Sequence, residues 1–323
     1  MIISDRNIKV WASVGPRATY GLAIMELAKL ENNLIVVTSD TSTSAGLERF
    51  KRKYPERYFD IGIAEQNTLG VSAGLANEGF ITFVSTFAPF QSMRCLEQIK
   101  VNLAYMQIPL KIVGIASGVN LGHLGYTHCC IEDLGVLRSL PNLTIVSPAD
   151  SLETAKAVYS SSLLKKPVYL RLTGDNNTPQ INKEDYNFQI GKAIQVFRGE
   201  TIAIVASGSM VGHAKEALIN LKSLGINLSL YNFHTIKPVD FVTLQKISKK
   251  YRLVVSIEEH NIIGGIGSTI AENFAKFDRS PRLLSWGIKD TYACTGSYQE
   301  ILRKAGLTSE ILTAKLKLEY DKV

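Results

Sequence analysis

The stretch that decides the fold reads IAIVASGSMVGHAKEALINL and occupies residues 202–221. It opens with five apolar residues in a row, which is typical of a strand buried on both faces of a parallel sheet. Apolar residues then recur at helical spacing, at Val211, Ala214, Leu218 and Leu221. These four share one face of a helix. A buried strand followed by an amphipathic helix is the repeating unit of α/β domains.

The same unit recurs on both sides of this stretch. One helix is expected to start near Pro16 and to run through Leu27, and another follows Asp150, with Glu153 placed as in a capping box. The alternation predicts an α/β fold of two doubly wound domains, with helices on both faces of each sheet. The strands that we expect are 34–39, 81–85, 110–116, 143–147, 168–172, 202–206, 227–233, 253–257 and 283–286.

The alternation of strands and helices weakens between Thr173 and Gly199. The segment 174–179 is rich in turn-forming residues, and a polar segment follows it. We therefore predict two domains, residues 1–182 and residues 183–323.

The composition excludes several classes of protein. The chain has 323 residues, of which 46% are hydrophobic and 20% charged, and its net charge is +7. No apolar run is long enough to cross a membrane, and the N-terminus does not resemble an export signal. The basic clusters 51–53 and 249–252 are short, so we interpret them as solvated surface rather than a nucleic-acid site.

The four cysteines are Cys95, Cys129, Cys130 and Cys294. None has the spacing of a zinc ligand, and no metal site is expected in this chain. Reduced thiols in a cytoplasmic protein are the simplest interpretation.

The most informative segment for function reads DIGIAEQN at residues 60–67. Small residues dominate the stretch 70–76 that follows, which favours a helix that approaches another backbone closely. Glu65 is expected at the N-terminus of that helix, where the helix dipole favours a carboxylate. A plain helix-start acid and a catalytic acid explain this residue equally well from the segment alone.

Further short motifs occur along the rest of the chain, each weakly specific alone but together highly specific. They are RF (49–50), PERYFD (55–60), IGIAEQN (61–67), STF (85–87), GYTH (125–128), IEDL (131–134), PNL (141–143), SPAD (147–150), YLR (169–171), IKPVD (236–240) and EEH…GGIGS (258–268). In this order they resemble transketolases and the related deoxyxylulose-phosphate synthases. The resemblance covers nearly the whole chain, and implies a pyrimidine-binding domain followed by a transketolase-type C-terminal domain.

The resemblance implies that the chain binds thiamine diphosphate. It makes Glu65 the catalytic glutamate that hydrogen-bonds a ring nitrogen of the aminopyrimidine and favours its imino tautomer. It places Phe87 and Phe90 against the aminopyrimidine ring, where an aromatic face offers a large apolar contact. Asp40, at the end of an expected strand, is predicted to face the cofactor.

The resemblance also implies a set of substrate-binding residues. His128 matches a histidine that lines the substrate channel and is expected to hydrogen-bond the substrate near the reacting carbon. Arg17, Ser44 and Arg171 match positions that bind the substrate phosphate, to which arginine offers a bidentate fork. For Arg171, a salt bridge at the domain interface is the alternative.

Two positions depart from the family pattern. Leu124 stands where the family usually has an aspartate that accepts a hydrogen bond from a substrate hydroxyl, and Met93 stands where transketolases often have a tyrosine. His123 is a candidate to replace the missing acceptor. These departures put the usual sugar specificity in doubt.

One family motif is absent from the sequence. Family members bind Mg²⁺ and the diphosphate through Gly-Asp-Gly and a later Asn, and no Gly-Asp-Gly occurs here. We therefore expect the Mg²⁺ ligands on a second chain that carries the diphosphate-binding domain, in an α2β2 heterotetramer. The glycines of 264–267 lack the spacing of a dinucleotide site and are interpreted as a tight strand-to-helix turn.

The leading hypothesis is the C-terminal subunit of a split transketolase that transfers two-carbon ketol units between sugar phosphates. A thiamine-diphosphate-dependent transferase or synthase with a non-standard sugar or keto acid is the alternative among enzymes. A non-catalytic scaffold paralogue is the alternative outside them, and the joint presence of Glu65, Phe87 and His128 argues against it.

Overall fold

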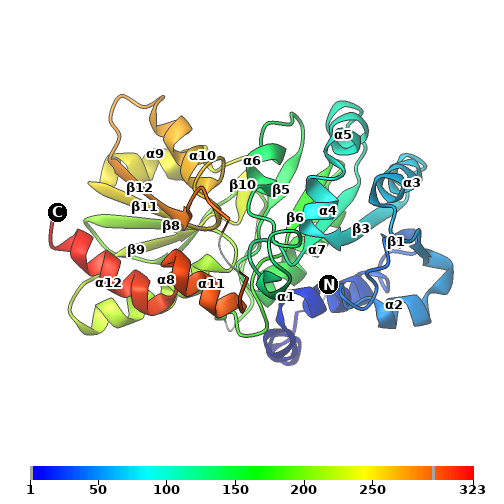
Figure 1. Cartoon of the computed structure of the whole chain (residues 1–323), viewed down its shortest axis with the longest axis horizontal. Helices are drawn as coiled ribbons and strands as arrows, with labels where there is room; N and C mark the ends of the chain where they lie inside the picture. Colours follow the sequence, from blue (N-terminus) through cyan, green and yellow to red (C-terminus); the bar gives the residue numbers. More distant parts are fainter. Residues whose placement is uncertain (1–2, 183, 293–294) are drawn as a thin grey trace.

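The computed structural model describes residues 3–182, 184–292 and 295–323. It has two lobes side by side, each with a central sheet between helices (Figure 1). The predicted domain boundary at residue 183 and Cys294 lie outside the described residues.

The first sheet has seven strands in the order β10-β5-β6-β4-β3-β1-β2. All neighbours run parallel except β10, which is antiparallel to β5. The strands are β1 (Leu34–Thr38), β2 (Tyr58–Asp60), β3 (Ile81–Phe87), β4 (Lys111–Ile115), β5 (Thr144–Val146), β6 (Val168–Arg171) and β10 (Thr235–Lys237).

Helices and helical turns connect these strands. The longest, α1, bends at Gly15, whose φ of 77° is open to glycine, and Pro16 then starts the second half. The capping predicted for Asp150 is confirmed, since its side chain accepts a hydrogen bond from the Glu153 N–H at the start of α7. The elements are α1 (Asp5–Leu27), α2 (Glu48–Lys53), η1 (Pro55–Arg57), α3 (Glu65–Asn77), α4 (Ala88–Ser92), α5 (Leu96–Gln98), η2 (Ile99–Tyr105), η3 (Gly122–Leu124), α6 (Asp133–Leu137) and α7 (Ser151–Ser162).

The second sheet has five strands in the order β12-β11-β8-β9-β7, parallel except for β7 against β9. Its strands are β7 (Ile194–Phe197), β8 (Ile202–Ala206), β9 (Ser229–Asn232), β11 (Leu253–Asn261) and β12 (Arg282–Ile288). Its helices are α8 (Met210–Ser223), α9 (Phe241–Lys250), α10 (Ile266–Phe274), α11 (Tyr298–Ala305) and α12 (Ser309–Tyr320).

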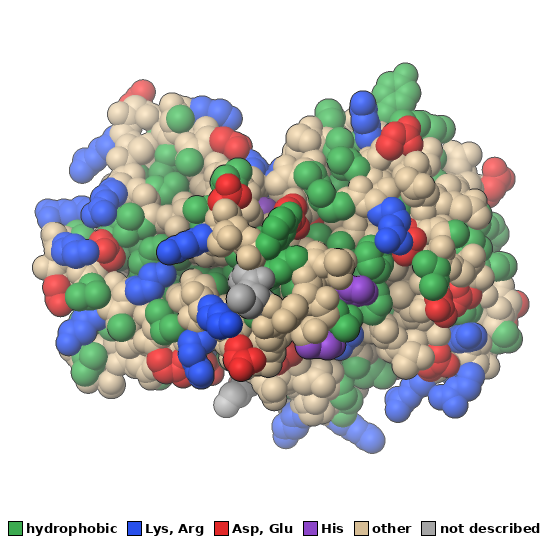
Figure 2. Space-filling model, in the orientation of Figure 1, with side chains coloured by type: hydrophobic (Ala, Val, Ile, Leu, Met, Phe, Trp, Pro, Cys, Tyr) green, Lys and Arg blue, Asp and Glu red, His purple; other side chains and the backbone are tan. Residues whose placement is uncertain are grey.

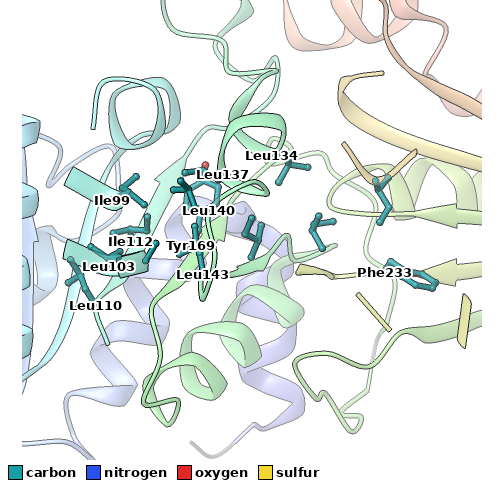
Figure 3. Close-up of a cluster of buried hydrophobic side chains, with 14 of the residues drawn as sticks. Ile99, Leu103, Leu110, Ile112, Leu134, Leu137, Leu140, Leu143, Tyr169 and Phe233 are labelled. Carbon is teal, nitrogen blue, oxygen red and sulfur yellow. The ribbon is translucent and has the colours of Figure 1, made fainter. Parts of the chain in front are cut away.

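The two lobes share a strand and a core. The strand β10 belongs to the second half of the chain but extends the first sheet through pairs such as Thr235 with Val146. One apolar cluster reaches from Ile99 and Leu103 in the first lobe to Phe233 in the second. Figure 3 shows Phe233 set apart from the other labelled side chains, on the C-terminal side of this cluster. The lobes are therefore packed against each other by an apolar core as well as by polar contacts.

The doubly wound α/β fold predicted from the sequence is confirmed. Each predicted strand overlaps an observed one, whereas the short strands β2, β7 and β10 were not predicted. Among the described residues, none of the helices combines the length and the apolar character needed to cross a bilayer. On the face that Figure 2 shows, a notch separates the two lobes, and Lys and Arg side chains are scattered rather than gathered in one patch.

Candidate active site

The predicted site residues come from loops at one edge of the first sheet. Strands β1, β2, β3 and β4 are parallel neighbours, so their carboxyl ends lie along the same edge. The segments that leave these ends carry Asp40, Glu65, Phe87 and His128. Ligands of open α/β sheets bind outside the carboxyl ends of the strands, so this edge is the expected place for a site.

Asp60 fixes the backbone on which Glu65 is presented. Its Oδ1 accepts hydrogen bonds from the Asp40 N–H at 2.9 Å and from the Gly62 N–H at 3.0 Å. Asp40 has a φ of 53°, in the left-handed region that aspartate tolerates better than most residues. The turn before α3 is thus tied to the end of β1, and α3 begins at Glu65 as expected.

Glu65 is a buried carboxylate with one oxygen engaged. Its side chain is 5% exposed, and its Oε2 accepts a hydrogen bond from the Arg94 Nη1 at 2.7 Å. Its Oε1 makes no hydrogen bond with a described residue. A buried carboxylate with a spare acceptor is suited to bind a further donor.

Three aromatic rings form an apolar wall beside this carboxylate. The ring centroids of Phe87 and Phe90 lie 6.4 Å apart, and that of His128 lies 6.2 Å from Phe87 and 5.4 Å from Phe90, all edge-to-face. The Arg94 guanidinium lies over the Phe90 ring, 4.1 Å from its centroid. Arg94 therefore bridges the aromatic wall and Glu65, with a contact to each.

The substrate loop that follows β4 presents mixed groups. His128 is half-buried, and its Nδ1 lies 3.0 Å from the Thr127 hydroxyl. His123 and Leu124 are both exposed, and Leu124 is 48% accessible. Met93, the other departure from the family pattern, is exposed as well.

Arg17 and Ser44 lie on segments packed tightly together. The loop that carries Ser44 approaches α1 so closely that a Cβ at Gly21 would lie 2.0 Å from the Gly46 carbonyl oxygen. Arg17 is half-buried and makes no hydrogen bond or ion pair with a described residue, and burial lowers the pKa of its guanidinium. A half-buried cation in this state is an unusual arrangement that an anionic ligand would satisfy.

Arg171 lies apart from these residues, buried between the two lobes. Its Nε donates to both oxygens of Asp133, at 2.8 and 3.0 Å, and its Nη2 donates to the carbonyls of Cys130 and Glu259. The side chains of Arg171 and Asp133 are 2% and 0% exposed. Burial acts to lower the pKa of Arg171, but the Asp133 carboxylate raises it well above the usual value. This geometry favours the interface ion pair over the phosphate site.

Sequence reasoning missed Arg94. A single arginine after a short helix carries no motif, and its relation to Glu65 spans 29 positions of the chain. The only available signal was its place four residues after Phe90, a spacing that brings side chains together on a helix. Asp60 was part of a recognised motif, but its role as a backbone acceptor appears only in three dimensions.

The arrangement is one half of a binding site. It offers an apolar wall, a buried acceptor and a cation that no described residue pairs with, but few groups that could hold a metal. Within residues 3–182, 184–292 and 295–323, no group of three or more His, Cys, Asp or Glu side chains is placed to bind a metal ion.

Comparison with protein families accounts for both lobes. The family model described as "Transketolase, pyrimidine binding domain" matches residues 13–179, which include every predicted site residue. The model described as "Transketolase, C-terminal domain" matches residues 191–312.

Relatives of similar length match along most of the chain. A "Putative transketolase C-terminal section" of Methanocaldococcus jannaschii is 36% identical over 309 residues, which cover 95% of this chain and 97% of the relative. A subunit of an apulose-4-phosphate transketolase of Phocaeicola vulgatus is 35% identical, with 95% and 97% covered. A "1-deoxy-D-xylulose-5-phosphate synthase" of Nitrosomonas europaea is 31% identical over 94% of this chain but only 48% of its own length.

Solved structures agree with these relatives. A chain from "Split gene transketolase, inactive beta4 tetramer" superposes with a TM-score of 0.84 at 33% identity, with 94% of this chain and 97% of that chain covered. The transketolase of Campylobacter jejuni shares the fold, with a TM-score of 0.78 at 19% identity over 94% of this chain and 46% of its own. With both domains matched, relatives above 30% identity and a half-site at the expected sheet edge, the chain belongs to the transketolase family of thiamine-diphosphate-dependent transferases, and it carries that family's pyrimidine-binding and C-terminal domains.

Proposed function

We propose that this chain is the C-terminal subunit of a split transketolase that transfers a two-carbon ketol unit between sugar phosphates. The observation that carries the proposal is the buried Glu65 carboxylate beside the wall of Phe87, Phe90 and His128. This combination fits a flat heteroaromatic ring that presents a nitrogen to the carboxylate.

The residues fit the aminopyrimidine half of thiamine diphosphate. Phe87 and Phe90 hold the ring, Glu65 holds a proton shared with a ring nitrogen, and Asp40 lies on the neighbouring loop. Bound thiamine diphosphate supplies the carbon nucleophile and the electron sink of the reaction. Arg94 has to leave at least part of the Phe90 face, because the guanidinium now covers it.

The substrate is held by the remaining groups. His128 lies against the aromatic wall and is placed to donate or accept a hydrogen bond near the reacting carbon. Arg17 and Ser44 bind the substrate phosphate, an anion that would satisfy the half-buried guanidinium. Arg171 has no part in this binding, because Asp133 and two carbonyls already occupy its guanidinium.

The diphosphate and Mg²⁺ are bound by a partner chain in the cytoplasm. The absence of a Gly-Asp-Gly sequence supports this, since that motif binds both groups in the family. Relatives that are named as single subunits of transketolases, or as a split-gene transketolase, support a partner in an α2β2 assembly.

Leu124 favours a substrate that differs from the ordinary ketose phosphates. It is exposed on the loop that carries His128 and offers no acceptor to a substrate hydroxyl. Relatives of this chain are named for apulose 4-phosphate and for 6-deoxy-6-sulfo-D-fructose, which supports a departure from the ordinary substrates. An enzyme of the same chemistry with a non-standard sugar or keto acid is therefore the second candidate.

Calorimetry with thiamine diphosphate and Mg²⁺ tests the split site. The chain alone should bind the cofactor weakly or not at all, because charge-assisted contacts to the diphosphate lie on the partner. Addition of a chain that carries Gly-Asp-Gly, encoded next to this one, should restore tight binding and ketol transfer. Tight binding by this chain alone would overturn the proposal.

A further inference from the structure

The loop that presents His128 leaves the first lobe and rests on the second. We call residues 118–131 the His128 loop. It begins after β4, and residues Gly118 and Cys130 close its base through paired backbone hydrogen bonds of 2.8 Å. Between these points the loop has one short helical turn, η3, so its own hydrogen bonds do little to fix its position.

Three hydrogen bonds attach the His128 loop to the second lobe. The Val119 N–H donates to the Glu259 Oε1 at 2.8 Å. The Gly296 N–H donates to the carbonyl of Gly122 at 3.1 Å, and the Asn261 N–H donates to the carbonyl of Ile131 at 2.9 Å. The loop is thus attached near both ends and at its middle.

Glu259 is itself held firmly. The residue is 2% exposed, and its Oε2 accepts hydrogen bonds from the hydroxyls of Ser209, at 2.5 Å, and Tyr298, at 2.8 Å. These two donors belong to the second lobe, so the carboxylate moves with that lobe. A buried acceptor that already has two partners can present its other oxygen to Val119 in one orientation only.

Side-chain packing adds to these hydrogen bonds. A Cβ at Gly122 would lie 2.2 Å from the Ile301 Cδ1 and 2.8 Å from the Gly296 carbonyl oxygen, so glycine alone fits between the loop and α11. The rings of Tyr126 and Tyr292 lie 5.0 Å apart, on the two sides of the same contact. His128 follows Tyr126 by two residues, and its ring contacts Phe87 and Phe90.

We propose that the second lobe sets the position of His128, with Glu259 and Ile301 as positioning residues that hold the His128 loop against the aromatic wall. The role of the loop in catalysis rests on the proposed function, whereas its attachment to the second lobe does not. The C-terminal domain then contributes to the active site through the loop although the proposal gives it no contact with the reacting atoms.

Hydrogen exchange tests the attachment. Ile301→Ala should speed amide exchange in a peptide that covers residues 119–130 and leave the 65–77 helix unchanged. Leu302→Ala, at the adjacent fully buried position of α11, is the matched control for loss of core volume. Ile301→Val, which removes the contacting Cδ1 but keeps the branched side chain, should give a smaller effect. If Ile301→Ala proves too unstable, Gly122→Ala should perturb the loop from the other side.

Kinetics of the assembled enzyme test the consequence. A misplaced loop should lower kcat/KM for a ketose phosphate by about ten- to hundredfold in Ile301→Ala but not in Leu302→Ala. Exchange of the cofactor C2 proton, which depends on Glu65, should stay as in wild type. Equal exchange in loop peptides of Ile301→Ala and Leu302→Ala overturns the attachment. Faster loop exchange with unchanged kcat/KM overturns the positioning role. Failure of the wild-type assembly to transfer ketol units overturns the proposed function and leaves the exchange test intact.

Discussion

The chain contains two arginine–carboxylate pairs that differ in almost every respect except their chemistry. Arg94 and Glu65 meet at the sheet edge, where the arginine is 44% exposed and touches the glutamate through one nitrogen. Arg171 and Asp133 meet between the lobes, where neither is more than 2% exposed. The Asp133 carboxylate also accepts a hydrogen bond from the Tyr169 hydroxyl at 2.7 Å.

The difference shows how burial decides the use of an ion pair. An exposed arginine can exchange its partner for water or a ligand at little cost, so the first pair can open. A buried pair with every carboxylate oxygen engaged cannot open without leaving a charge in an apolar interior. The first pair therefore belongs to the proposed site, and the second fixes the interface.

The largest effect is expected for Glu65→Gln. Glutamine keeps the shape and can still bond Arg94, but it cannot share a proton with a ring nitrogen. Cofactor C2 proton exchange in the assembled enzyme should slow by roughly 10²–10⁴-fold, with an unchanged melting temperature. Unchanged exchange would remove Glu65 from the mechanism.

Arg171→Ala should mainly cost stability. Removal of the guanidinium leaves Asp133 buried and charged, which should lower the free energy of unfolding by about 3–5 kcal/mol. Urea denaturation measures this loss, and Arg171→Met combined with Asp133→Asn should recover part of it. A stable Arg171→Ala variant with a raised KM for phosphorylated substrates alone would restore the phosphate role that the family resemblance implies.

The interface pair should also make stability depend on pH through His260. This ring is fully buried 3.8 Å from Asp133, and burial together with the Arg171 charge lowers its pKa to about 4. An unfolded histidine takes up a proton near pH 6.5, but the native one does so only near pH 4. Stability should therefore fall as the pH drops from 6.5 to 4, by on the order of 3 kcal/mol. His260→Gln should flatten this part of the pH profile, and an identical profile would contradict the assignment.

The smallest effect is expected for Arg94→Met. Its pair with Glu65 is half open to solvent, so its loss should change the free energy of unfolding by less than about 1 kcal/mol. The same urea titration serves as for Arg171→Ala. A loss as large as that of Arg171→Ala would show that the two pairs are not different in kind.

Much of the fold could be predicted because buried parallel strands leave continuous apolar runs. The missed strand β2 is only three residues long, and two of its residues are exposed, so it has no such run. The missed β10 is three residues long and forms only by pairing with a strand about 90 positions earlier.

The site could be predicted in part. Family motifs led to Glu65, Phe87, Phe90 and His128, and the sheet edge brings their segments together. The same motifs could not separate a phosphate ligand from an interface ion pair at Arg171, because its partner Asp133 is 38 positions away. Nor could they reveal that Arg94 covers Phe90.

The strand β10 has a consequence for anyone who would divide this chain. A cut at the linker between the matched domains looks natural on paper, but it would strip the first sheet of its outermost strand and leave the edge of β5 with unpaired backbone groups. Such an edge invites pairing with other chains, so a fragment that ends before β10 should aggregate. As a unit of inheritance and of engineering, the two domains behave as one piece.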